Sequence, residues 1–415
     1  MTALTPPMGW NSWDCYGAAV TEETVRKNAE YMADHLKEFG WEYIVVDIQW
    51  AGANAVGHAY EPFADLTMDE FGRLTPALNR FPSAADGKGF RPLADYIHSL
   101  GLKFGIHIMR GMPRAAAHRR LPIEGSEYFC HMAANPHSVC MWNPDMYGLH
   151  CDRPEAEAYY DSIFRLYASW CVDFIKCDDI AREYPQCRRE IELISEACRR
   201  CGRDMVLSLS PGPSPLEQAE HLKKYANMWR ITDDFWDDWR LLKGMFERAE
   251  KWCIHAGPGH WPDADMLPVG ALRQCDGPEG WTRFSQAEQR NMMTLWCMMR
   301  SPLMIGGDMT KNDDFTLDLL TRKELLEIEK TAWCAHPLYT TDDESVWIAP
   351  RKDGKGLYLA LFNLSDKKRT VSVTAEKIGR SSITGHEIWT GKETRNARRI
   401  RTILAPHDAA AFRID

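Results

Sequence analysis

The sequence predicts an α/β fold, a (β/α)8 TIM barrel followed by a C-terminal antiparallel β-sandwich. Two observations support this prediction. Up to about residue 330, eight short β-rich runs alternate with longer segments of helical pattern, which is typical of a closed barrel. Beyond that point, short alternating runs separated by turn residues indicate antiparallel strands. We therefore expect a catalytic barrel domain over residues 1–330 and a β-sandwich domain over residues 331–415.

The barrel strands are expected, in chain order, at residues 9–13, 43–50, 103–109, 174–179, 205–211, 228–235, more weakly at 254–265, and at 302–309. The first helix is expected in "TEETVRKNAEYMADHLKEFG" (21–40), where apolar residues recur every three or four positions between a Thr N-cap and the C-cap Gly40. Segments 51–95 and 110–150 are expected to be long loops over the barrel mouth.

Composition limits the classes of partner. The chain has 415 residues, 45% hydrophobic and 26% charged, with 16 Trp, as expected for a globular protein with a large core. A net charge of −9 argues against nucleic-acid binding and favours a neutral or cationic small substrate. The N-terminus "MTALTPPMGW" lacks the basic and apolar segments of a signal peptide, and no apolar stretch is long enough to span a membrane. We therefore expect a cytoplasmic protein that does not bind membranes.

The 13 cysteines are scattered and odd in number, which excludes a complete disulfide framework and favours a reducing compartment. The single Cys-x-x-Cys, "CRRC" at 198–201, has no further ligands at metal spacing, so we expect helix thiols and no metal site. The many Trp residues are compatible with sugar subsites or with a homo-oligomer contact.

Most expected strands begin with apolar residues and end with polar ones. Because barrel active sites lie at the C-terminal ends of the strands, these polar residues should converge on one face. They are Asp47, His107, Lys176, Asp178, Ser210, Arg230, Asp234 and Asp265. Two acidic clusters, "KCDD" (176–179) and "RITDDFWDDW" (230–239), could supply the ionised and the protonated carboxyl that glycosidic cleavage needs. The alternative is that these aspartates are helix caps or solvated loop residues.

Six stretches in order, "TPPMGWNSWDCYG" (5–17), "VVDIQW" (45–50), "FIKCDD" (174–179), "WRITDDFWDDW" (229–239), "GPGHWPDADML" (257–267) and "SPLMIGGDM" (301–309), resemble glycoside hydrolase family 27. The resemblance covers essentially the whole chain. It implies a retaining exo-glycosidase of α-galactosidase type that acts on a terminal galactose-like sugar of an oligosaccharide or glycoconjugate. No metal or organic cofactor is implied.

The resemblance also implies residue roles. Asp178 would be the nucleophile and Asp234 the general acid/base, with Asp233 as the alternative one position away. Lys176, Arg230 and Asp265 would contact the substrate, and Trp13 would form an aromatic wall of the pocket. Asp179 is expected to support the loop. The two catalytic carboxyl groups of a retaining enzyme should lie about 5 Å apart.

Four positions depart from the family pattern. Galactosidases of the family end the second strand in two aspartates, but here the pair is Asp47 and Ile48. Isoleucine cannot accept a hydrogen bond, which suggests a β-L-arabinopyranosidase, because that sugar is the galactose configuration without the exocyclic hydroxymethyl group. The alternative is that Ile48 is a core residue and that Gln49 or the 51–95 segment binds this group.

The other departures are His107 in place of a Tyr, Cys177 in place of an aromatic residue, and Ser210. A small residue at Ser210 resembles the α-N-acetylgalactosaminidases of the family. His107 is equally compatible with a structural role, and Cys177 is expected to be buried and inert. Outside this class, a non-catalytic sugar-binding protein would bind without turnover. A metal-dependent barrel hydrolase would need metal ligands, and the first strand lacks a His-x-His pair.

Overall fold

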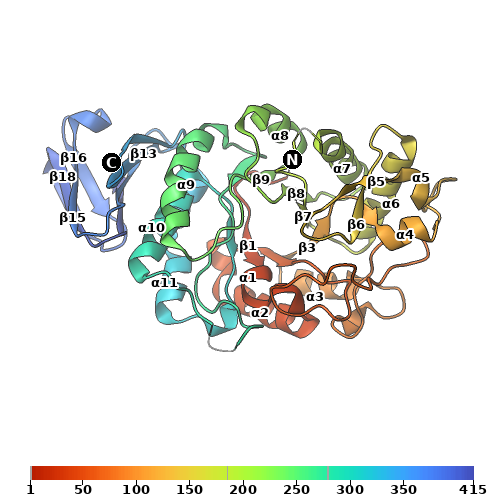
Figure 1. Cartoon of the computed structure of the whole chain (residues 1–415). Coiled ribbons are helices and arrows are strands. Elements are labelled where there is room, and N and C mark those ends of the chain that lie inside the picture. The colour runs from red at the N-terminus through yellow and green to blue at the C-terminus, as the bar shows by residue number, and fades with distance from the viewer. Residues whose placement is uncertain (1, 185, 278–279) are drawn as a thin grey trace.

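The computed structural model describes residues 2–184, 186–277 and 280–415. A barrel and a smaller β-domain lie side by side (Figure 1). The barrel strands are β1 (Met8–Asn11), β2 (Tyr43–Val46), β3 (Lys103–Met109), β7 (Phe174–Asp178), β8 (Val206–Leu209), β9 (Met228–Arg230), β10 (Trp261–Asp263) and β11 (Leu303–Ile305). All eight expected strands are present, and most are shorter than the sequence runs that predicted them.

The barrel sheet is parallel, in the order β10-β9-β8-β7-β3-β2-β1-β11. Its two edges are joined by the segment that follows β10. Leu267 N donates to Met304 O at 2.7 Å, and Gly306 N donates to Leu267 O at 2.9 Å. A single parallel bridge between Leu267 and Ile305 results. The C-terminal ends of all eight strands therefore surround one mouth.

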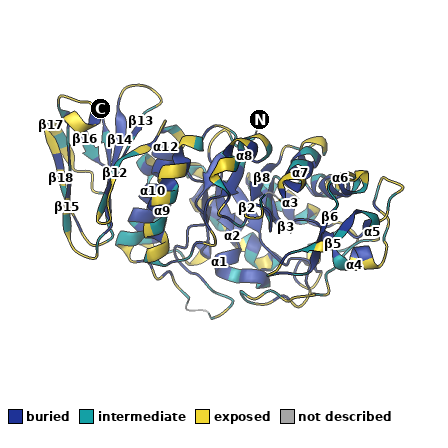
Figure 2. Cartoon of the chain, turned by 45° about the horizontal axis from the view of Figure 1, so that its top comes forward, coloured by how far each residue is buried: buried dark blue, intermediate teal, exposed yellow. Residues whose placement is uncertain are grey.

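Helices surround the barrel sheet, with their exposed sides outward and the strands buried (Figure 2). They are α2 (Glu22–His35), α3 (Arg91–Ser99), α6 (Pro154–Ser169), α7 (Arg188–Arg200), α8 (Ala219–Tyr225), α9 (Trp239–Trp252), α10 (Gln286–Met299), α11 (Asp314–Thr321) and α12 (Lys323–Thr331). Thr21 caps α2 as expected, because its side chain accepts a hydrogen bond from Thr24 N. Gly40 (φ 102°) ends the 3-10 turn that follows α2. No helix among the described residues is both long and apolar enough to cross a bilayer.

The two long segments over the mouth differ from expectation in one respect. Residues 110–150 were expected to be a loop, but they hold a three-stranded antiparallel sheet of β4 (Met112–Pro113), β6 (Met146–Leu149) and β5 (Ala134–Val139). Two short helices, α4 (Arg114–His118) and α5 (Cys130–Ala133), join these strands. The strands are too short and irregular to give an alternating pattern, so the sequence does not reveal them. Residues 51–81 contain no regular helix or strand.

The C-terminal domain is the expected antiparallel sandwich. A six-stranded sheet contains, in spatial order, β12 (His336–Thr340), β13 (Glu344–Pro350), β14 (Leu357–Asn363), β19 (Ala409–Ile414), β16 (Ile383–Glu387) and β17 (Glu393–Ala397). A two-stranded sheet of β15 (Arg369–Thr374) and β18 (Arg399–Leu404) covers one of its faces.

Strand β14 is buried on both faces. Leu357, Leu359 and Leu361 pack towards β15 and β18. The intervening Tyr358, Ala360 and Phe362 belong to the core shared with the barrel. Phe362 meets Phe246 of α9 with ring centroids 5.0 Å apart. Because successive side chains of a strand point to opposite faces, one face of β14 packs in the sandwich core and the other packs in the core shared with the barrel.

Candidate active site

Asp178 is the last residue of β7, and its carboxylate is held from two directions. His107 Nε2 of the neighbouring strand β3 lies 3.0 Å from Asp178 Oδ2, and Asp179 N donates to Oδ1 at 2.9 Å. Burial alone would raise the pKa of Asp178, but the His107 hydrogen bond and the charge of Lys176 outweigh it and hold that pKa well below its usual range. The carboxylate at this strand end is therefore ionised.

Lys176 and Asp47 form a buried ion pair beside Asp178. Lys176 Nζ donates to Asp47 Oδ2 at 2.8 Å, and Asn11 Nδ2 donates to the same oxygen at 2.7 Å. Ile48 N donates to the other oxygen of Asp47 at 2.8 Å. Burial opposes ionisation of Asp47, but the charge of Lys176 dominates and lowers the pKa of the carboxyl. The floor of the mouth therefore holds the opposite charges of Asp47 and Lys176, fixed in place by the Asn11 amide at the end of β1.

Arg230, at the end of β9, binds two further carboxylates. Its Nη2 lies 3.0 Å from Asp234 Oδ1 and 2.7 Å from Asp265 Oδ2. Phe235 N also donates to Asp265 Oδ2 at 2.7 Å. Burial, followed by the charges of neighbouring aspartates, raises the pKa of Asp265 to about 7. The Asp234 side chain is 54% exposed, so its carboxylate contacts both Arg230 and solvent.

The structure separates the two aspartates that the sequence leaves as alternatives. The Asp233 side chain is 66% exposed and pairs with Arg182, which follows β7. Asp234, by contrast, lines a pocket at the barrel mouth together with Asp178. The geometry therefore favours Asp234 over Asp233 as the second catalytic carboxyl.

This mouth pocket collects most of the residues that the sequence proposes. Its lining residues are Trp13, Asp14, Asp47, Tyr60, Lys176, Asp178, Arg230, Asp234, Phe235, Trp236, Asp265 and Met266. Ser210 lies outside this set and lines an adjoining cavity that also contacts Lys176 and Arg230. His107 and Ile48 line a third cavity on the β2–β3 side. His107 therefore acts on the pocket through its contact with Asp178.

Aromatic rings form one wall of the mouth pocket. Trp13 stacks on Tyr60 with ring centroids 5.3 Å apart and an interplanar angle of 6°. Trp142 packs against the far side of Tyr60 at 4.9 Å. Such flat faces suit the C–H surface of a sugar ring.

Ile48 belongs to an apolar cluster behind this wall. It is 4% exposed and packs with Trp13, Met109, Cys140 and Met146. The neighbouring Gln49 is already engaged, because its Nε2 lies 3.2 Å from both Glu61 O and Asp145 Oδ2 and its Oε1 accepts from Glu61 N at 3.3 Å. The end of β2 therefore offers Asp47 to the mouth pocket, while the apolar side chain of Ile48 lines the adjoining cavity on the β2–β3 side.

The sequence interpretation missed several pocket residues. Asp14 of the mouth pocket and Asn11 of the adjoining cavity lie within the stretch 5–17, in and just after the first predicted strand, so their position could have identified them. Burial raises the pKa of Asp14 well above its usual range, and one of its carboxyl oxygens lacks a hydrogen-bond partner. Tyr60 and Trp236 lie in irregular segments whose placement no local pattern predicts.

On and just after β7, Cys177 and Asp179 have supporting positions next to Asp178. Asp179 adopts a positive φ of 59°, and its carbonyl accepts from Arg110 Nε at 2.7 Å. Its carboxylate lies 3.0 Å from Arg110 Nη2. Cys177 is fully buried, and burial raises the pKa of its thiol. Asp179 thus stabilises the turn that follows Asp178, and Cys177 lacks the ionised sulfur that a nucleophile requires.

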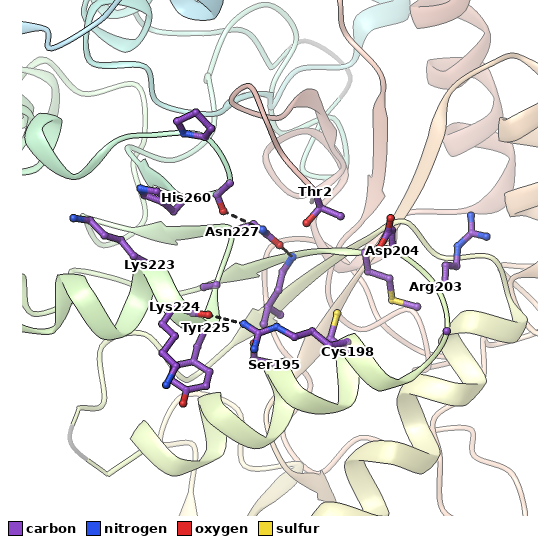
Figure 3. A pocket seen from close by; sticks show the side chains of 17 residues that line it. Thr2, Ser195, Cys198, Arg203, Asp204, Lys223, Lys224, Tyr225, Asn227 and His260 are labelled. Atoms are coloured by element: carbon purple, nitrogen blue, oxygen red, sulfur yellow. Dashed lines mark hydrogen bonds between the residues drawn. The ribbon is translucent and has the colours of Figure 1, made fainter.

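A larger cavity, about 890 Å³, lies at the opposite end of the barrel, beside the N-terminal ends of β8, β9 and β10. Figure 3 shows this cavity with two hydrogen bonds from its side chains to the backbone. Asn227 donates to Gly259 O at 3.0 Å, and Arg199 donates to Lys224 O. Because catalytic residues of such barrels lie at the C-terminal ends of the strands, this cavity is not the active site.

A barrel mouth that combines an ionised carboxylate, a solvent-facing carboxylate and an aromatic wall is an arrangement that glycoside hydrolases use. Comparison with known proteins agrees. The family profile described as alpha galactosidase A matches residues 5–134 and 142–331, and the alpha galactosidase C-terminal beta sandwich domain matches residues 341–414. The chain belongs to glycoside hydrolase family 27, and it is a glycosidase.

Two solved structures and one curated relative are similar over nearly the whole chain. A family 27 β-L-arabinopyranosidase from Geobacillus stearothermophilus is 51% identical, with a TM-score of 0.96 and coverage of 100% of this chain and 97% of its own. A candidate α-N-acetylgalactosaminidase from Bacillus halodurans C-125 is 48% identical, with a TM-score of 0.90 and coverage of 100% and 98%. An α-galactosidase from Cyamopsis tetragonoloba is 28% identical, with coverage of 93% of this chain and 80% of its own.

Proposed function

We propose that this glycosidase is a retaining exo-enzyme that releases terminal β-L-arabinopyranose. The observation that supports this most is the apolar end of β2, where Ile48 is buried among Trp13, Met109 and Met146. A hydroxymethyl oxygen that reached Ile48, where family galactosidases have an acidic residue, would lose its water without gaining a hydrogen bond from this side chain, which costs about 1–3 kcal/mol. A pentopyranose lacks that group and avoids the cost. The 51% identical relative is named for this substrate.

In the proposed mechanism, Asp178 attacks the anomeric carbon while Asp234 gives its proton to the departing glycosidic oxygen. The glycosidic bond breaks as a covalent glycosyl ester forms on Asp178. Asp234, now ionised, then removes a proton from water. The resulting hydroxide attacks the anomeric carbon and displaces Asp178, so the sugar leaves with its original configuration.

The surrounding charges fit these roles. His107 and Lys176 keep Asp178 ionised and ready to attack. Asp234 opens to solvent, where an aglycone and then water can reach it. Lys176 and Asp47 offer charged hydrogen-bonding groups to the ring hydroxyls at the pocket floor.

Activity on α-galactosides is the second candidate, because Asp47, Lys176 and Arg230 are present as in the family's galactosidase pattern and the 28% identical relative is an α-galactosidase. Activity on α-N-acetylgalactosaminides is the third, on the basis of Ser210 and the relative from Bacillus halodurans. Ser210 is buried and lines the adjoining cavity, so it does not itself widen the mouth pocket.

The variant Ile48→Asp tests this proposal. It restores the acceptor at the end of β2, so the ratio of kcat/KM for nitrophenyl β-L-arabinopyranoside to that for nitrophenyl α-D-galactopyranoside should fall by roughly tenfold or more. Ile48→Leu, the matched control, should keep the wild-type ratio. Ile48→Asn provides a neutral acceptor if the buried charge impairs folding, which circular dichroism would detect. An unchanged ratio in both folded polar variants would contradict the role given to Ile48.

A further inference from the structure

Three potential metal ligands converge beside the sugar pocket, outside the catalytic machinery. They are His58, Cys275 and Asp276. His58 Nδ1 lies 2.8 Å from Asp276 Oδ2 and 3.4 Å from Cys275 Sγ. Cys275 Sγ lies 3.7 Å from Asp276 Oδ1. The ligands come from two segments 218 residues apart, so the fold, and not local sequence, brings them together.

These separations approach those of a tetrahedral metal site. With bonds of about 2.0–2.3 Å to N, O and S ligands, the edges of a Zn²⁺ tetrahedron measure about 3.3–3.8 Å. The sulfur–nitrogen distance of 3.4 Å falls in this range, and so does the 3.7 Å from Cys275 Sγ to Asp276 Oδ1, although the oxygen that contacts His58 is Oδ2 and one carboxylate oxygen must turn to face both ligands. The nitrogen–oxygen distance would need to open by about 0.5 Å. One imidazole, one thiolate and one carboxylate form a ligand set typical of Zn²⁺.

The hydrogen bonding of His58 points to a cation at its Nδ1. Nε2 lies 2.9 Å from the carbonyl oxygen of Trp13, which can only accept, so Nε2 carries the proton. Nδ1 faces the Asp276 carboxylate 2.8 Å away, and because two acceptors repel at that distance, a positive charge belongs between them, which either a second ring proton or a metal ion supplies. The Cys275 thiol can donate a hydrogen bond to Nδ1, but the Asp276 carboxylate still faces the same nitrogen. Metal-binding histidines are commonly oriented by such a bond from the other ring nitrogen to a carbonyl.

We propose that His58, Cys275 and Asp276 bind a divalent cation of the Zn²⁺ class, with a fourth position open to solvent. On binding, the Cys275 thiol releases its proton to water, and the thiolate, the His58 lone pair and one Asp276 oxygen bind the ion. His58 and Cys275 are half-buried and Asp276 is exposed, so the site exchanges metal with solvent.

The site is coupled to the sugar pocket through His58. Its ring packs edge-on against Trp13 and Trp236, with centroids 5.3 and 5.7 Å away, and both indoles line the pocket. An ion that separates His58 from Asp276 therefore moves the ring that packs on the aromatic wall. Occupancy should change KM for the sugar more than kcat, because the catalytic carboxylates lie on other strands.

Titration of the metal-free, full-length chain with Co²⁺ tests the site directly, because thiolate ligation gives an absorption band that other ligands do not. We expect one Co²⁺ per chain, loss of the band in Cys275→Ser and at least tenfold weaker binding in Asp276→Asn. Cys334→Ser, which removes an exposed cysteine elsewhere, is the matched control and should bind as wild type. No thiolate band in the wild type, or a band that persists in Cys275→Ser, would overturn the proposal.

Kinetics test the coupling. Zn²⁺ should raise KM on a nitrophenyl glycoside severalfold in the wild type and in Cys334→Ser, but not in Cys275→Ser. Stoichiometric binding that leaves KM unchanged would overturn the link to the pocket.

Discussion

The two carboxylates at the barrel mouth differ in the charges that surround them. Asp178 accepts a hydrogen bond from His107 and lies near Lys176, and its pKa is held low. Asp234 is half exposed and contacts Arg230. Environments that differ in this way allow chemically identical groups to take the roles of nucleophile and general acid/base.

The role of Asp234 leads to a prediction about leaving groups. Asp234→Ala should lose roughly 10²–10⁴-fold in kcat/KM on a disaccharide, whose leaving oxygen needs a proton, and much less on a nitrophenyl glycoside, whose leaving group is acidic. Comparison of the two substrates measures the difference. Asp233→Ala is the matched control, because that exposed carboxylate pairs with Arg182, and it should lose little on either substrate. Equal losses on both substrates in Asp234→Ala would exclude a role in protonation.

The buried Asp265 predicts a pH dependence of stability. Burial raises its pKa from 3.8 to about 7 in the folded protein. Between these values the folded chain holds a proton that the unfolded chain releases, so this stabilisation is present below pH about 4 and is lost as pH rises through about 7. Urea unfolding across that window should show a smaller loss of stability in Asp265→Asn than in the wild type. A parallel decline in both proteins would contradict the prediction.

Among the helices and strands, the sequence predicted those whose capping residues or apolar runs match their position and burial in the structure. Thr21 caps α2 and Gly40 ends the 3-10 turn that follows it, because N-cap hydrogen bonding and a positive φ are local requirements. The barrel strands were found because apolar runs mark buried parallel strands. Strands such as β9 are shorter than predicted, because "ITDDF" turns away at the mouth to carry Asp234.

The elements that were missed depend on contacts between distant segments. The β4–β6–β5 sheet pairs short strands across a long connection, and the barrel closes through Leu267 after β10 instead of through β10 itself. Site residues, too, could be proposed from the sequence only where a local pattern marks their position. Asp178, Lys176 and Arg230 could be proposed because they follow predicted strands, whereas Tyr60 lies in a segment without regular structure. The His58–Cys275 contact likewise has no local signal.

At the scale of the whole molecule, the barrel and the sandwich share one core. Phe362 and Tyr358 of β14 face the barrel, and Arg290 of α10 binds both carboxylate oxygens of Asp408 at 2.9 and 3.0 Å. The ring of His407 stacks on Trp239 with centroids 3.7 Å apart. We therefore expect the two domains to unfold together.

Phe362→Ala tests the shared core. Removal of this fully buried ring should lower the free energy of unfolding by about 3–5 kcal/mol. The urea transitions followed by tryptophan fluorescence and by far-ultraviolet circular dichroism should still coincide. Phe63→Ala, which removes a ring that is 70% exposed, should be nearly neutral. An early transition confined to one probe would show that the domains unfold independently.

In the proposed function, the apolar Ile48 that follows Asp47 selects a pentopyranose over a hexopyranose. The most direct measurement compares kcat/KM of the wild-type protein on nitrophenyl β-L-arabinopyranoside, α-D-galactopyranoside and α-N-acetylgalactosaminide under one set of conditions. The account predicts the highest value for the arabinoside, by roughly tenfold or more over the galactoside. A preference for the galactoside would mean that another group binds the hydroxymethyl oxygen, and would contradict the assignment.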